Sequence, residues 1–269
     1  MTGQYPDADV VPRSGSGGTI HIDTPHAKGL SGDTADGRLP RSVRTEDGWR
    51  TSPEPDAGST PARGHVGYGT CVGSWEKLPC NIIPWVGDKD RPLIILSGQP
   101  SIGVAYNVIL DAYRGKGMDA VVLLHDDLEI TDPNAEKKFL AALDEDVALV
   151  GVAGGGPALR WWDHHPIGHQ MTDSGLLDFG QRTGDVDMLE GSIVVFSPWA
   201  VENLSIDERY TDFRSGWDDV CLHARAAGKR VVVVDVDTHH HTTVGWKTPQ
   251  IEAKFIESER MFAEKWAAA

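Results

Sequence analysis

Cysteine is scarce in this 269-residue chain: Cys71, Cys80 and Cys221 are the only three, and their spacing is not that of a zinc motif. We therefore expect a reducing compartment and no disulfide framework. Long apolar runs are also missing. No stretch approaches the roughly 18 residues of a membrane-spanning helix, and no apolar segment typical of a secretory signal follows Met1. These absences predict a cytoplasmic protein without a transmembrane segment.

Positive charge is in short supply as well. The chain has 25 Lys and Arg residues against 40 Asp and Glu residues, which gives a formal net charge of −15. Proteins that bind duplex DNA without sequence preference do so mainly by neutralising phosphates with basic side chains. Nonspecific DNA binding is therefore not expected, although a locally basic groove remains compatible with this composition.

The N-terminal part of the chain lacks a sustained apolar pattern and is rich in Gly, Ser, Thr, Asp, Pro and Arg. Such a segment cannot bury enough apolar surface to offset the entropy of the chain. We predict that residues 1–63 form a disordered, low-complexity arm. Residues 64–269 are long enough for one domain with a sizeable core.

Residues 64–269 alternate between patterns of buried strands and of amphipathic helices. The predicted strands lie at 65–73, 91–97, 120–125 and 147–153, with helices from 101 and 133 between them. This order predicts an α/β domain, with a mostly parallel central sheet flanked by helices. Residues 160–183 are predicted to form a long loop. A C-terminal helix at about 250–267 is expected to dock on the domain, because its polar face carries too many Glu residues for a membrane anchor.

An apolar strand that runs into two adjacent carboxylates is the most informative feature of the sequence. Residues 121–124 read Val-Val-Leu-Leu, which is typical of a strand buried on both faces, and Asp126 and Asp127 follow just after it. Ligands bind at this end of the strands in open α/β sheets. Because unpaired carboxylates are costly to desolvate, we expect a divalent cation carrying phosphates here. The alternative is a helix cap, but Asp132-Pro133 already supplies one.

Three other segments carry side chains suited to the same ligand. In the turn and helix start from Gly98 to Asn107, backbone N–H groups and Ser101 could meet phosphate or ribose, although an ordinary N-cap also explains Ser101. Trp217-Asp218-Asp219 opens a helix, where the helix dipole favours acids without any catalytic role. The run 239–241 is three histidines after a buried strand, and imidazole is a good ligand for Mn²⁺, Zn²⁺ or Fe²⁺.

Taken in order, these segments resemble the family-2-like glycosyltransferases of the GT-A fold. The run 101–107 and Leu124-His125-Asp126-Asp127 are similar to the donor half of that family, in which a strand ends in an acidic motif, often His-x-Asp. Leu189-Glu190-Gly191-Ser192, the run 219–231 and His241-x-Thr243-x-Gly245 resemble the later motifs. The resemblance covers about residues 66–246, and it rests on the order and spacing of the motifs.

The resemblance implies transfer of a sugar from a nucleotide-diphosphate donor to an acceptor hydroxyl, assisted by Mn²⁺ or Mg²⁺, and an Asp base would make the reaction inverting. The sequence leaves open the sugar, the choice between inversion and retention, and the acceptor, which is a glycan, a lipid, a protein or a modified nucleic acid. Asp127 takes the position of the metal-binding Asp, with Asp126 assisting, and His241 completes the metal or diphosphate site. The other implied site residues are Asp218 or Asp219 as base, Ser97, Ser101, Asn107 and Asp126 for the donor, and Trp161, Trp162, Glu190, Gly191 and Trp217 for the acceptor.

Two departures from the family pattern leave alternatives open. Trp217 stands two places before Asp219, where many relatives carry an acid, so the base is not assigned to one residue. The acids Asp126 and Asp127 are adjacent, where a strict DxD motif separates them. A catalytically inactive sugar-nucleotide or carbohydrate-binding module, and a metal-dependent phosphoester hydrolase or nucleotidyltransferase, are the competing hypotheses.

Overall fold

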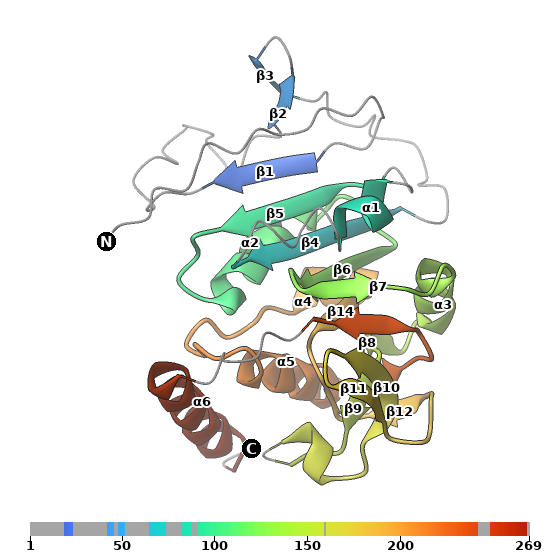
Figure 1. The fold of residues 1–269 in the computed structure, drawn as a ribbon, viewed down its shortest axis with the longest axis vertical. Helices are drawn as coiled ribbons and strands as arrows, with labels where there is room; N and C mark the ends of the chain where they lie inside the picture. Colours follow the sequence, from blue (N-terminus) through green and yellow to red (C-terminus); the bar gives the residue numbers. More distant parts are fainter. Residues whose placement is uncertain are drawn as a thin grey trace.

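An eight-stranded sheet with helices on both faces forms the centre of the molecule (Figure 1). The computed structural model describes residues 19–23, 42–45, 48–51, 65–73, 82–87, 91–158, 160–241 and 248–267. The sheet has the order β1-β5-β4-β6-β14-β8-β15-β12. Its strands are β1 (Thr19–Asp23), β4 (Val66–Val72), β5 (Leu93–Ser97), β6 (Ala120–His125), β8 (Val147–Gly151), β12 (Gly184–Val186), β14 (Ile193–Phe196) and β15 (Arg230–Val233).

Parallel pairing dominates this sheet, but only by a small margin. The pairs β1–β5, β5–β4, β4–β6 and β8–β15 are parallel. Strand β14 runs antiparallel to both β6 and β8, and β12 runs antiparallel to β15. The predicted α/β class is therefore confirmed, with four of the seven pairings parallel.

Strand β6 is buried on both faces, as its unbroken apolar sequence predicts. Val121 and Leu123 belong to one core cluster, and Val122 and Leu124 belong to the cluster on the opposite face. Successive side chains of a strand point to opposite faces, so a four-residue apolar run can serve two cores. The strand is thus fixed from both sides, and its carboxyl end holds His125 in a defined position.

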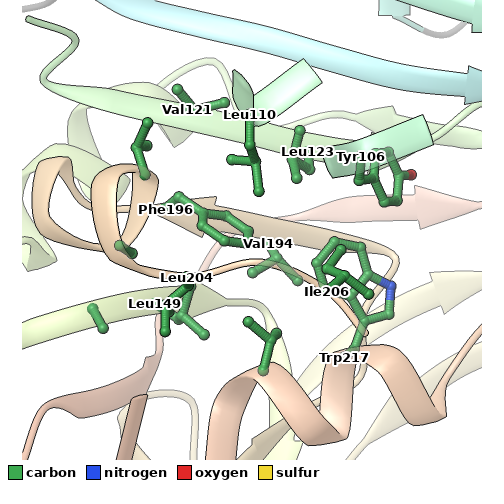
Figure 2. Packing of buried hydrophobic residues seen from close by; sticks show 14 of the residues in the cluster. Tyr106, Leu110, Val121, Leu123, Leu149, Val194, Phe196, Leu204, Ile206 and Trp217 are labelled. Carbon is green, nitrogen blue, oxygen red and sulfur yellow. The ribbon is translucent and has the colours of Figure 1, made fainter. Parts of the chain in front are cut away.

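The helices divide between these two cores. Residues of α2 (Ile102–Tyr113), α4 (Pro198–Asn203) and α5 (Ser215–Ala226) pack on the first core, and residues of α1 (Ile82–Gly87) and α3 (Ala135–Ala142) pack on the second. Figure 2 shows the first core, where Trp217 of α5 lies close to Tyr106 of α2, with ring centroids 5.1 Å apart. Helix α3 begins after Asn134 and not at an Asp132 cap. Asp132 instead accepts a hydrogen bond from the Asn134 N–H and pairs with Lys138.

A smaller sheet stands beside the carboxyl end of β6. Its order is β13-β9-β10-β16-β7, and β11 pairs with β10. The strands are β7 (Leu128–Ile130), β9 (Ala153–Gly155), β10 (Ile167–Thr172), β11 (Gly175–Asp178), β13 (Met188–Leu189) and β16 (Thr238–His240). The prediction of a long loop over 160–183 is therefore wrong. All four residues of β11 are exposed, so this strand has no apolar alternation to reveal it, and β10 supplies its hydrogen-bonding partner.

Three short strands lie within the segment predicted to be a disordered arm. Strand β1 extends the central sheet by pairing with β5, while β2 (Ser42–Thr45) and β3 (Gly48–Thr51) pair with each other. These strands depart from an arm without regular structure. Strand β1 forms because the edge of β5 offers backbone partners that the apolar pattern does not report, and β2 and β3 supply partners to each other. The other residues of the predicted arm lie outside those described, and the domain boundary near position 63 stays a prediction.

The C-terminal helix α6 (Pro249–Ala267) forms where the sequence predicts it, and it contacts α5 (Figure 1). Phe262 and Ser258 are its buried residues. Within the described part of the chain, no helix has the length and apolar character needed to cross a membrane.

Candidate functional site

The two acids after β6 turn to different neighbours. One carboxylate oxygen of Asp126 (Oδ2) accepts a hydrogen bond of 2.8 Å from the backbone N–H of Gly73, just beyond β4. Asp127 instead lies beside the small sheet, where its carbonyl accepts a 2.8 Å hydrogen bond from the backbone N–H of His241. The two acids therefore have different surroundings. Asp127 lies beside the small sheet, and Asp126 lies beside the ends of the parallel strands β4 and β6.

Asp127 meets two histidines. Its Oδ1 lies 3.2 Å from Nε2 of His240, the last residue of β16. The ring of His125 lies 5.5 Å from the ring of His240, measured between centroids. One ligand atom from each of His125, Asp127 and His240 lies within 4.8 Å of the others. We call these three residues the inner cluster. The structure places the side chain of His240 beside Asp127, whereas the family resemblance implies His241.

The inner cluster has the properties of a metal-binding group. Nε2 of His125 is buried and has no hydrogen-bond partner among the described residues. Burial, followed by the nearby His240, lowers the pKa of His125 below its usual value of 6.5, so the imidazole keeps its lone pair at neutral pH. Two imidazoles and a carboxylate suit Mn²⁺, Zn²⁺ or Fe²⁺. An imidazole with an orphaned ring nitrogen, grouped with a carboxylate and a second imidazole, fits a bound cation.

Glu190 and Gly191 lie next to the inner cluster. Oε1 of Glu190 lies 3.9 Å from Nδ1 of His240, and its Oε2 accepts a hydrogen bond from the Ser192 N–H. Gly191 has a φ of +98°, and a Cβ built there would lie 2.3 Å from the indole of Trp217. Only glycine allows this approach. Glu190 therefore faces the inner cluster, while Trp217 is 2 % exposed and supports it from within the core.

His241 belongs to a different group of side chains. Its Nε2 lies 3.2 Å from Glu129 Oε2, and its Nδ1 lies 3.2 Å from Asp173 Oδ1. Residues along a strand alternate between faces, so 239 and 241 share the face that 240 does not. The sequence proposed one ligand from the histidine triplet. The structure shows that the triplet serves two faces of the small sheet.

The predicted donor-binding residues of the turn after β5 have local partners. Ser101 caps α2 by accepting a hydrogen bond from the Val104 N–H. Asn107 donates to the Ile206 carbonyl and accepts from the Ile206 N–H, so it fastens α2 to the segment after α4. Ser97 is a buried residue at the end of β5, and its carbonyl accepts a bond from Gln99. Ser101 and Asn107 thus have structural contacts that account for them.

The two tryptophans of the predicted acceptor site differ in exposure. Trp161 is buried and packs edge-on against Phe179. Trp162 is 41 % exposed, and the guanidinium of Arg214 lies 5.2 Å from its ring centroid. Of the two, Trp162 is the one whose ring is open to a sugar or base.

The two candidate bases are buried and paired. Asp219 accepts hydrogen bonds of 2.9 Å from Lys265 and 2.8 Å from the Trp266 indole, both on α6. Asp218 lies 3.3 Å from Arg214, which also pairs with Glu259 of α6. Burial raises the pKa of Asp218 well above its usual value, and Arg214 offsets part of that rise. Asp219 therefore connects α5 directly with α6, Asp218 does so only through Arg214, and neither is grouped with the inner cluster.

Sequence reasoning did not assign a role to His125 or choose His240. The signal for His125 was present, since His125-Asp126-Asp127 has the His-x-Asp form of the family motif. The choice within the triplet required the register of β16 against β7, which pairs His240 with Leu128 and His239 with Glu129. That register follows from hydrogen bonding between segments that are distant in the sequence.

Comparison with known proteins supports the fold. No protein-family model matches the sequence. The chain is 30% identical over 186 residues to the streptomycin biosynthesis protein StrF of Streptomyces griseus, covering 65% of this chain and 66% of StrF, just under two thirds of that relative. It also resembles a structure of GalNAc-T7 with UDP, GalNAc and Mn²⁺, with a TM-score of 0.50 and 7% identity, covering 81% of this chain and 50% of that one.

A second structure is the mannosyltransferase PcManGT of Pyrobaculum calidifontis in complex with GDP-Man and Mn²⁺. It has a TM-score of 0.47 and 11% identity, and the match covers 81% of this chain and 79% of that one. The likeness to GalNAc-T7 establishes the arrangement of the sheet and its helices. The GT-A fold expected from the sequence is thereby confirmed.

Proposed function

We propose that this chain is a glycosyltransferase that takes a sugar from a nucleotide-diphosphate donor, with a divalent cation held by His125, Asp127 and His240. The observation that carries the proposal is the inner cluster itself, which lies at the carboxyl end of β6 in a GT-A fold. The similar structure of GalNAc-T7 contains UDP, GalNAc and Mn²⁺, which supports a sugar nucleotide and Mn²⁺ for this chain. The acceptor carries a hydroxyl.

Each residue of the site has a part in this chemistry. A cation bound there would stabilise the negative charge that develops on the leaving diphosphate. Asp126, held by Gly73, lies between the ends of β4 and β6, where it can contact the donor. Glu190 lies 3.9 Å from Nδ1 of His240, whose Nε2 faces Asp127, and it can accept a hydrogen bond from the acceptor. Trp162 offers an exposed ring for stacking.

Asp219 or Asp218 is proposed as the base that takes the proton of the acceptor in an inverting reaction. Asp219 is the better candidate, because burial favours the protonated form of Asp218, which cannot accept a proton. For Asp219 to reach an acceptor hydroxyl, its bonds to Lys265 and Trp266 must open. The proposal thus requires α6 to move from α5 during the reaction.

A panel of UDP-, GDP- and dTDP-sugars with Mn²⁺ tests the donor proposal. We expect one sugar nucleotide to raise the melting temperature of the wild-type protein and to be hydrolysed slowly without an acceptor. The matched control is Asp127→Asn, in which both effects should disappear. If no sugar nucleotide changes the melting temperature or is hydrolysed, but a simple phosphoester is turned over with Mn²⁺, the protein is a hydrolase and the glycosyltransferase proposal fails.

The base is tested by Asp219→Asn and Asp218→Asn, each compared with wild type for donor binding and for transfer. A general base contributes about 10²- to 10⁴-fold to the rate. We expect Asp219→Asn to keep donor binding and to lose about 1,000-fold in transfer, with a smaller loss for Asp218→Asn. Unchanged transfer in both variants would reject an Asp base in α5. Retained donor binding without transfer in wild type would favour a binding module.

A further inference from the structure

The outward face of the small sheet carries a second group of histidines and acids. In the register of this sheet His239 pairs with Glu129 on one side and with Met171 on the other. Side chains two residues apart share a face, so His241 and Asp173 extend the same row. These four residues, Glu129, Asp173, His239 and His241, form what we call the outer cluster.

The contacts within the outer cluster are short, and two of them share one oxygen of Asp173. Asp173 Oδ1 lies 3.1 Å from His239 Nε2 and 3.2 Å from His241 Nδ1. The rings of His239 and His241 are nearly parallel, with centroids 3.9 Å apart. Glu129 Oε2 lies 3.2 Å from His241. The register of β16 that places His240 in the inner cluster therefore also brings together the two imidazoles and two carboxylates of the outer cluster.

These spacings match those of ligands around one ion. Two ligand atoms bound to a tetrahedral Zn²⁺ at about 2.0–2.1 Å lie roughly 3.4 Å apart. The distances from Asp173 Oδ1 to both histidine nitrogens are close to that value. One ligand atom each from Glu129, His239 and His241 also falls within a 4.8 Å group. His241 faces Asp173 with Nδ1 and Glu129 with Nε2, so closing all four ligands around one cation requires the His241 ring and the carboxylates to turn until they meet at one nitrogen of that ring.

The outer cluster is open to solvent and bridges three segments of the chain. The side chains of His239 and His241 are 28% and 31% exposed, so an ion can enter without unfolding. Glu129 lies on β7, Asp173 follows β10, and His239 belongs to β16. An ion held there would fix β16, the strand that also carries His240 on its inner face.

We propose that Glu129, Asp173, His239 and His241 form a second divalent cation site, of the Zn²⁺ class, separate from the inner cluster. Two imidazoles and carboxylate oxygens make a ligand set that Zn²⁺ accepts in tetrahedral geometry. The ion stabilises the small sheet by joining β7, the β10–β11 turn and β16. This site does not depend on the proposed sugar transfer, because none of its ligands belongs to the inner cluster.

Titration of the full chain with Zn²⁺ alone, followed by calorimetry or a competing chelating dye, tests the proposal. We expect two equivalents bound by wild type and one by His239→Gln/His241→Gln. Asp127→Asn/His240→Gln should keep the outer equivalent. The matched control is His164→Gln/His165→Gln, which removes another close pair of histidines, with ring centroids 4.4 Å apart, and should bind as wild type does.

A single substitution, Asp173→Asn, tests the same site in case the double variant does not fold. We expect it to lower the affinity for Zn²⁺ at the outer cluster by about tenfold or more. Saturating Zn²⁺ should raise the melting temperature of Asp127→Asn/His240→Gln by about 5 °C. If wild type and His239→Gln/His241→Gln bind the same number of ions with the same affinity, the outer site does not exist. That result would leave the donor proposal untouched, because the Asp127→Asn/His240→Gln titration and the sugar-nucleotide panel report on the inner cluster.

Discussion

The inner and outer faces of the small sheet carry similar side chains in different surroundings. The inner face sets His240 against Asp127, with side chains 12% and 19% exposed, beside the ring of His125. The outer face sets His239 and His241 against Asp173, with side chains between 28% and 45% exposed. The inner face is backed by the core of the domain, and the outer face is turned to solvent.

This difference separates two uses of one strand. Interactions between charged and polar groups are stronger where water is excluded, so a cation on the inner face can act on a bound diphosphate. A cation on the outer face has only protein ligands and solvent beside it, and its effect is limited to stability. Neighbouring histidines of β16 are therefore expected to differ in what their loss does.

The largest expected effect is on turnover. His240→Ala removes an inner ligand, and loss of metal stabilisation worth several kcal/mol lowers the rate by about 100- to 1,000-fold. His239→Ala, its neighbour on the opposite face, should cost less than about tenfold. Steady-state transfer at saturating Mn²⁺ measures both. Equal losses of transfer rate in the two variants would contradict the assignment of catalysis to the inner face alone.

Stability should show the next effect, at the glycine that supports the inner face. A Cβ at position 191 collides with the indole of Trp217, and its φ is in the left-handed region, so Gly191→Ala should lower the free energy of unfolding by about 3 kcal/mol. Gly228→Ala is the control, because its φ is also positive but nothing lies within 4 Å; about 1 kcal/mol is expected there. Urea unfolding measures both losses. A similar loss of unfolding free energy in the two variants would mean that the Trp217 ring shifts to make room for the added methyl group.

The inner face should also give stability its own pH dependence. The pKa of His125 is lowered in the folded protein, so between that pKa and about 6.5 the unfolded chain binds more protons. The resulting contribution is complete above pH 6.5 and is lost as pH falls, at no more than about 1.4 kcal/mol per pH unit. His125→Gln should therefore show a shallower fall from pH 7.5 to 5.5 in metal-free urea unfolding. Parallel curves for variant and wild type would contradict this.

The smallest effect belongs to the outer face without metal. His241→Gln breaks contacts to Glu129 and Asp173 that are partly exposed and therefore screened by water. Pairs of this kind contribute about 0–1 kcal/mol, so the free energy of metal-free unfolding should change by no more than that. Urea unfolding in the presence of a chelator measures it. A loss well beyond this range would show that the outer face is a structural centre even without an ion.

The central fold could be predicted because its signals are local. The apolar run before His125 and the helical spacing of apolar residues after Ser101 each involve residues that are close together in the sequence, and the structure places both in the core. The small sheet could not be predicted in the same way. Strand β11 is exposed throughout, and β16 has its partners in β7 and β10, far away in the sequence.

The sequence predicts that Asp127 and one histidine of the triplet belong to one candidate site, and the structure places His240 beside Asp127, but their role as metal ligands stays a prediction. A pattern of three consecutive histidines does not say which one faces inward, since a shift of one residue in register exchanges the faces. The partners of Asp219 also come from outside its own motif. Lys265 and Trp266 belong to α6, more than forty residues further along the chain. Its assignment as base stays a prediction.

The contact between Gly191 and Trp217 has a consequence for how this sequence can change over time. The glycine is required because a large ring occupies the space above it, so the two positions are constrained as a pair. We expect relatives with a side chain at position 191 to carry a smaller residue at 217, and relatives that keep the tryptophan to keep the glycine. An aligned set of homologues would then show the two columns varying together, although the positions belong to different elements of the chain.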